Sequence, residues 1–146
     1  MLESRSRPTV FSLTATVISS GSSPSASWRS TNFTTFDSLT VPADASAAAE
    51  IAAALPRSRV LKAFNTTIAA TLASGNVGPL RTTVLIAGDD TDAKALLAGI
   101  ITAAGLCAID AGALARAREL EALGFLQITL AAGEKVSWTG GFGVVA

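Results

Sequence analysis

The sequence predicts an α/β fold, a three-layer domain with a short parallel sheet of at least three strands and flanking helices. Three apolar segments each stop at small or polar residues and then run into a stretch with helical character: residues 60–66, 83–90 and 107–112. This strand–helix rhythm is typical of doubly wound sheets, which bind ligands just beyond the ends of their strands.

The first expected elements are a helix over residues 47–55 and a strand over residues 59–64. Asp44 or Ser46 can cap the helix, and Pro56 follows its end. A second helix is expected from Thr66 or Thr67 to about Ala73, because the glycines and proline of residues 75–79 terminate it.

The next strand–helix unit has the clearest pattern in the chain. A strand is expected over residues 82–87, followed by a helix that Asp90 or Thr91 caps and Gly105 ends. Apolar side chains recur along this helix with the spacing of one sheet-facing stripe: Ala93, Leu96, Leu97, Ile100 and Ile101. Residues 106–111 form the third expected strand, and Asp110 can bond nearby backbone groups.

A longer helix is expected over residues 113–132. Its core positions are Leu114, Ala117, Leu120, Leu123 and Leu130, whereas Arg116, Arg118, Glu119 and Glu121 are assigned to its solvated face. Helical crossovers between three strands imply a parallel sheet. One edge of this small sheet would expose pairing groups unless residues 9–18, which alternate weakly, or a partner covers it.

The composition fits one domain of 146 residues and excludes several kinds of site. Eleven basic and eleven acidic residues give zero net charge, so the chain lacks the basic field that nucleic-acid binding needs. Histidine and tyrosine are absent, which excludes a histidine base, a histidine-ligated metal and a Ser/His/Asp triad. The single cysteine, Cys107, lies in an apolar strand pattern, so we expect a small buried hydrophobe and a cytoplasmic protein.

The first 31 residues differ from the rest. Residues 1–31 are serine-rich and are expected to be a poorly ordered leader, while residues 32–146 form the folded part. The apolar stretch near the start is short and interrupted by Ser12, Thr14 and Thr16, so neither a secretory signal nor a membrane span is predicted.

Several polar residues lie at the expected strand ends. Asp90 is expected to cap a helix, and Asp89 and Asp90 lack the third carboxylate that a metal site would need. Lys62 can either reach a phosphate or extend to the rim of the sheet. The glycines of residues 140–143 follow no strand and open no helix, so they make a poor phosphate loop. A site of this composition suits hydride transfer between two organic cofactors, where the protein aligns the rings and excludes water.

The strand-end segments, taken in order, resemble the NADPH-dependent coenzyme F420 reductases. The segments are residues 62–66 (KAFNT), residues 87–90 (AGDD) and residues 105–112, with Leu114 and residues 117–121 behind them. The resemblance covers residues 32–146, as the C-terminal part of such a reductase, and it implies that the α/β domain is a partial Rossmann-like (NAD(P)-binding type) fold. The glycine-rich dinucleotide loop of the family has no counterpart in this sequence.

This resemblance implies hydride transfer between NADP(H) and coenzyme F420 or a flavin. It implies that Ala63, Phe64, Asn65 and Thr66 border the nicotinamide and deazaflavin rings and that Leu114 closes the pocket, with no catalytic side chain and no metal. It also implies a homodimer through the helix at residues 113–132. The alternatives are a non-catalytic truncated remnant and a protein-interaction module.

Overall fold

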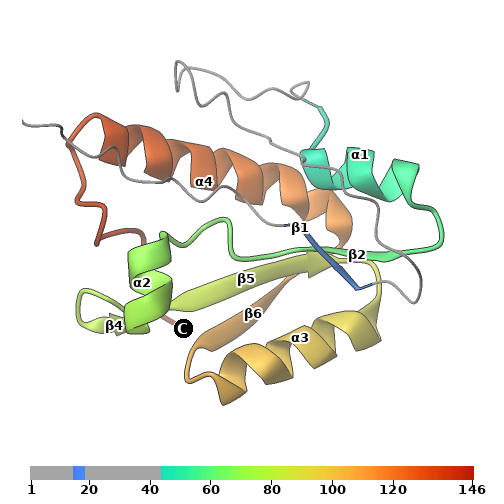
Figure 1. Ribbon diagram of the computed structural model, residues 1–146, viewed down its shortest axis with the longest axis horizontal. Coiled ribbons are helices and arrows are strands. Elements are labelled where there is room, and N and C mark those ends of the chain that lie inside the picture. Colours follow the sequence, from blue (N-terminus) through green and yellow to red (C-terminus); the bar gives the residue numbers. More distant parts are fainter. Residues whose placement is uncertain (1–14, 19–43) are drawn as a thin grey trace, which may run out of the picture.

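The computed structural model describes residues 15–18 and 44–146, and these form a mixed α/β fold (Figure 1). A four-stranded sheet has the order β1 (Ala15–Ile18), β2 (Arg59–Lys62), β5 (Thr83–Gly88) and β6 (Cys107–Gly112). Helices α1 (Ala47–Ala54) and α4 (Ala117–Ala132) lie on one face, and α3 (Thr91–Ala103) lies on the other. The predicted α/β class, with helices on both faces, is confirmed.

The direction of β2 differs from the prediction. Strands β5 and β6 are parallel, as expected, but β2 is antiparallel to β5, with Leu61 opposite Gly88 and Lys62 opposite Ala87. Residues 63–82 connect the two strands, which is long enough for a parallel crossover, but such a crossover usually contains a helix that packs across the sheet. The helix in this connection, α2 (Ala69–Ser74), has only six residues and is followed by a hairpin, after which the chain enters β5 antiparallel to β2.

The hairpin itself was not predicted. Strands β3 (Asn76–Val77) and β4 (Leu80–Arg81) pair antiparallel around Gly78 and Pro79, which the sequence analysis treated only as a helix terminator. Helix α2 also begins later than expected. Thr67 donates from its backbone nitrogen and from Oγ1 to the Phe64 carbonyl, and these bonds make a turn where a helix start was expected.

Strand β1 pairs with β2 along the edge that would otherwise expose its backbone hydrogen-bonding groups. Ala15 lies opposite Lys62 and Ile18 opposite Arg59 in an antiparallel register. The expectation that residues 9–18 cover this edge is therefore confirmed for residues 15–18. The rest of the expected leader, residues 1–31, and the expected loop at residues 32–37 lie outside the described residues.

The core forms on both faces of β2 because its side chains alternate. Leu61 and Ala63 join the cluster beneath α3, while Val60 packs with Leu114 and the helix α1. On α3 only part of the expected stripe faces the sheet. Ala93, Leu97 and Ile101 are buried, but Leu96 and Ile100 are each 58% exposed. That expectation was wrong because a step of one residue turns a side chain about 100° away from the contact.

The helix starts follow the capping rules closely. Ser46 Oγ accepts from the Ala49 nitrogen, and Asp90 Oδ1 accepts from the Ala93 nitrogen, so both caps are confirmed. The expected helix over residues 113–132 begins instead as a short 3₁₀ turn, η1 (Leu114–Arg116), and continues as α4. Cys107 is half-buried at the start of β6 and not fully buried as expected.

One ion pair joins α3 to the end of β6, and it predicts that the stability of the protein depends on pH. Lys94 Nζ lies 2.8 Å from Asp110 Oδ2, and the Gly112 nitrogen donates to Asp110 Oδ1. The hydrogen bond from Lys94, with that from Gly112, lowers the pKa of Asp110 below the ordinary value of an aspartate. The resulting stability is present above the unfolded pKa, about 3.9, and is lost as the pH falls through the lower folded value.

We therefore expect Asp110→Asn to flatten the fall of unfolding free energy between about pH 4 and pH 2. The effect is small, roughly 0.5 kcal/mol, because the carboxylate is largely exposed to solvent. Urea unfolding of both proteins across this pH range measures it. Parallel pH profiles for the wild type and Asp110→Asn would contradict the assignment.

Candidate functional site

The first candidate site is the turn that follows β2, where the chain leaves the sheet. Phe64 has φ of 66°, a left-handed conformation that is uncommon for a residue other than glycine. Two bonds from Thr67 to the Phe64 carbonyl hold this turn, at 2.8 Å from Oγ1 and 3.3 Å from the backbone nitrogen. Strained backbone of this kind is often found at functional sites.

Asn65 is the polar centre of this turn. Its side chain is 7% exposed, and its Nδ2 donates to the Leu120 carbonyl of α4 at 2.6 Å. Its Oδ1 is buried and has no hydrogen-bond partner among the described residues. A buried acceptor without a donor is costly, so this oxygen is an exception that the other contacts of the turn must offset.

Gly124 of α4 allows Asn65 to lie so close to the helix. A Cβ added to Gly124 would be 2.5 Å from the Asn65 carbonyl oxygen and 3.0 Å from Asn65 Nδ2. The sequence analysis missed Gly124. A glycine in a helix interior, on the buried stripe that also holds Ala117 and Leu120, was the signal that could have found it.

The neighbours of Asn65 in the predicted site are mostly part of the core. Ala63 is fully buried in the cluster beneath α3, and Phe64 packs partly against the same cluster. Thr66 is buried beside Asn65 in the chain, with 7% exposed. Residues 63–66 thus follow β2 directly, and three of the four are buried.

A buried ion pair lies two residues before this turn. Lys62 Nζ is 3.0 Å from Glu121 Oε1, and the two side chains are 2% and 1% exposed. The backbone nitrogens of Ala47 and Ala48 also donate to this carboxylate, at 3.0 and 3.3 Å. Burial lowers the pKa of Lys62 below 10.5, while the charge of Glu121 and the hydrogen bond to it act in the opposite direction.

This pair corrects two expectations. Lys62 neither extends to the rim of the sheet nor is free to reach a phosphate, and Glu121 does not lie on the solvated face of α4. The physical reason is register: Lys62 shares a face of β2 with the buried Val60, and Glu121 lies four residues after the buried Ala117. The ion pair was not predicted because its two partners lie far apart in the sequence.

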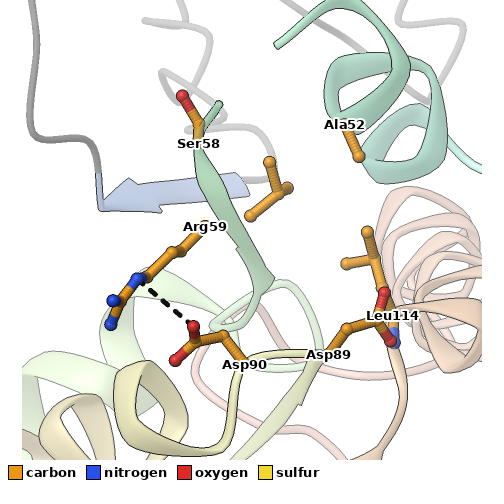
Figure 2. A pocket seen from close by; sticks show the side chains of 7 residues that line it. Ala52, Ser58, Arg59, Asp89, Asp90 and Leu114 are labelled. Atoms are coloured by element: carbon orange, nitrogen blue, oxygen red, sulfur yellow. Dashed lines mark hydrogen bonds and ion pairs between the residues drawn. The ribbon is translucent and has the colours of Figure 1, made fainter. Parts of the chain in front are cut away.

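The second candidate site is a cavity at the other end of β2, beside the start of that strand and the end of β5. Its volume is about 290 Å³, and its lining comprises Ala52, Ser58, Arg59, Val60, Asp89, Asp90 and Leu114 (Figure 2). Arg59 Nε lies 3.2 Å from Asp90 Oδ2, and Asp89 Oδ1 accepts from the Leu114 nitrogen at 2.9 Å. The charged groups of this cavity are thus engaged in a helix cap, a surface ion pair and a backbone bond.

The structure places two of the predicted site residues in different parts of the core. Leu114 packs with Val60 and α1 on one face of the sheet, whereas Ala63 joins the cluster beneath α3, against which Phe64 also packs. Leu114 and Ala63 therefore lie on opposite faces of the sheet.

The described residues offer little acid–base or metal chemistry. They contain no group of three histidine, cysteine or acidic side chains placed to hold a metal ion. Asp89 and Asp90, considered as a metal pair, serve as a backbone acceptor and a helix cap. What the turn after β2 can do is accept a hydrogen bond, present a small apolar surface and exclude water.

Comparison with known proteins finds similarity among solved structures. Neither a protein-family model nor a curated protein sequence matches this chain. Among solved structures, a candidate F420-dependent NADP reductase from Arthrobacter sp. FB24 superposes with a TM-score of 0.65 at 24% sequence identity. The match covers 75% of this chain and 50% of that protein.

The chain has the fold of this reductase. It spans about half the length of the matched protein, and at this identity the similarity shows the fold alone. The fold predicted from the strand-end segments is therefore confirmed. In the part of the chain that the structure describes, every helix is too short or too polar to cross a membrane.

The two contacts of Asp90 in this cavity lead to a prediction about stability. We expect Asp90→Ala to lower the free energy of unfolding by about 1 kcal/mol, because it removes the cap of α3. Arg59→Ala should cost less than about 0.5 kcal/mol, because the Arg59 side chain is 59% exposed in its ion pair. Chemical denaturation measures both, and equal losses would show that the ion pair, and not the cap, is the stabilising contact.

Proposed function

We propose that this chain is the ring-binding part of an NADP-dependent reductase that transfers a hydride between NADP(H) and coenzyme F420 or a flavin. The observation that supports it most is the shared fold with a candidate F420-dependent NADP reductase, with the Phe64–Thr66 turn at an edge of the sheet. The proposal covers a small-molecule site in a cytoplasmic protein. A homodimer through α4, on which Leu126 is an exposed apolar residue, is part of the same proposal.

The polar group that the turn offers to the ring end of such cofactors is the Asn65 amide. Its Oδ1 has no hydrogen-bond partner among the described residues and could accept from an N–H group of a carboxamide or of a heterocyclic ring. Ala63, Asn65 and Thr66 are buried, so the turn would have to open for a ring to reach them, while the half-buried Phe64 adds apolar surface. When bound, NADPH supplies the hydride, and the deazaflavin or flavin takes it up together with one proton from water.

The absence of histidine and tyrosine agrees with this role. Hydride transfer needs two aligned rings and a dry site, and it needs no side chain to carry a proton in the reacting step. Asn65 and the backbone of residues 63–66 would orient the rings, and α4 would exclude water behind them. These 146 residues contain no glycine-rich dinucleotide fingerprint that would bind the pyrophosphate of NADPH.

A fluorescence titration with NADPH tests the proposal. We expect saturable binding with Kd near 1 mM, about −4 kcal/mol, because only the ring end is held. Asn65→Ala should weaken binding at least about fivefold, since a buried hydrogen bond is lost. The matched control Asn76→Ala, at an exposed asparagine of β3, should leave Kd unchanged.

No saturable signal from a folded chain at millimolar NADPH would contradict the proposal. The alternatives would then be a non-catalytic remnant or an interaction module. Light scattering of the same sample separates these two, because an interaction module of the self-associating kind would not be a monomer.

A further inference from the structure

We propose that the open edge of β6 binds a second copy of this chain. The β6 strand of that copy pairs antiparallel with it about a two-fold axis at Ile109, so that the two sheets become one continuous sheet. This interface is separate from the α4 surface of the proposed homodimer. It is also independent of the proposed hydride transfer, because no residue of the Phe64–Thr66 turn takes part in it.

Strand β6 has one side without a strand partner. It is the last strand of the sheet, whose order is β1, β2, β5 and β6, and within residues 15–18 and 44–146 only β5 pairs with it. Figure 1 shows β6 on the far side of β5 from β2. An unpaired strand edge is a template for another chain, and proteins often block it with proline or charged side chains. Strand β6 contains no proline, and its one charged residue, Asp110, is paired with Lys94.

The backbone direction along β6 shows which groups the open edge offers. The Cys107 nitrogen donates to the Thr82 carbonyl at 3.0 Å, on the side of β5. Successive residues of a strand direct their backbone groups to alternate sides. Cys107 and Ile109 therefore direct their N–H and C=O groups to β5, whereas Ala108 and Asp110 direct theirs to the open edge.

Two side chains of the same molecule close the far end of this edge. The Gly112 nitrogen donates to Asp110 Oδ1 at 2.8 Å, and the Gly112 carbonyl accepts from Lys94 Nζ at 3.3 Å. The register between β5 and β6 also shifts here. The groups that remain for a partner are thus the N–H and C=O groups of Ala108 and Asp110.

A second β6 strand matches these groups. In an antiparallel pair, residues that exchange two hydrogen bonds alternate with residues whose side chains meet without such bonds. With the axis at Ile109, Ala108 lies opposite Asp110 of the partner subunit, and Asp110 opposite the partner's Ala108, so both pairs exchange their bonds. Ile109 then meets Ile109 of the partner subunit in the closely spaced pair, which buries two half-exposed apolar side chains.

Neighbouring registers fit less well. An axis at Asp110 would place two carboxylates directly opposite each other, which is destabilising. An axis at Ala108 would place Asp110 opposite Leu106 of the partner subunit, but the Leu106 nitrogen already donates to the Ile101 carbonyl at 3.2 Å. The free groups and the charge of this edge therefore select the register at Ile109.

Helix α3 leaves room for the second copy. Lys94 marks the flank of α3 that faces β6, and Ala98 and Thr102 follow it at intervals of four residues. Because α3 packs over both β5 and β6, the two α3 helices of the dimer lie two strand spacings apart, about 10 Å. This is a normal distance between packed helices, and the small side chains at 98 and 102 permit it.

A disulfide cross-link tests the register. We expect Ile109→Cys, made in a Cys107→Ala background and oxidised with diamide, to form a covalent dimer. Opposite residues of such a pair have Cα atoms about 4.5 Å apart, a distance that a disulfide spans. The matched control is Ala49→Cys, an exposed position of α1 in the same background. The Ile109→Cys protein should cross-link at least about tenfold faster than this control, and equal rates would overturn the inference.

Sedimentation velocity at high micromolar concentration tests the interface without a covalent bond. The wild type should be a dimer or larger, and Ala108→Pro should lose this contact, because it removes an N–H group from the open edge and none from the side of β5. The matched control Ala108→Ser keeps the N–H group and should keep the contact. Ile109→Lys provides a second route if Ala108→Pro does not fold, since it places two like charges opposite each other at the axis.

The variant Leu126→Lys separates this interface from a contact through α4. It should leave the cross-linking of Ile109→Cys unchanged, because Leu126 lies on α4 and away from β6. A folded wild-type monomer would overturn the inference, and so would a dimer that survives in Ala108→Pro and Ile109→Lys but is lost in Leu126→Lys. Neither result bears on NADPH binding, which the fluorescence titration measures separately.

Discussion

The carboxylate of Glu121 lies at the point where β2, α1 and α4 meet, and the arrangement of these three elements depends on it. It accepts from Lys62 Nζ at 3.0 Å and from the backbone nitrogens of Ala47 and Ala48 at 3.0 and 3.3 Å. Burying a charge costs several kcal/mol unless it is paired and fully hydrogen-bonded. Here one cation and two amides at the start of a helix supply that compensation.

This contact also sets the geometry of the site. Glu121 follows Leu120, whose carbonyl receives the Asn65 amide, and Lys62 precedes Asn65 by three residues. Two successive residues of α4 thus hold β2 and the turn after it, and Gly124 contacts the same turn one helical turn later. The contacts with α4 determine the position of the Phe64–Thr66 turn more than the hydrogen bonds within the turn do.

Most local features of this chain were predictable, and long-range ones were not. Strands β2, β5 and β6, the two caps and the long C-terminal helix follow from side-chain periodicity and from Ser46 and Asp90, which act within three residues. The short hairpin of β3 and β4 was missed. The direction of β2 is decided by pairing with β5, which no local pattern records. Glu121 was assigned to solvent, and Lys62 to a phosphate or to the rim of the sheet, because the two residues lie far apart in the sequence and neither position shows its partner.

A double-mutant cycle on Lys62 and Glu121 tests the central claim most directly. Lys62→Met and Glu121→Gln, each alone, remove one partner of a buried pair and should each cost about 3 kcal/mol of unfolding free energy. The double variant should cost less than the sum of the two by at least about 1 kcal/mol, because neither charge is then left unpaired. Losses that add within about 0.5 kcal/mol would show that the two side chains do not interact, and would contradict the role assigned to Glu121.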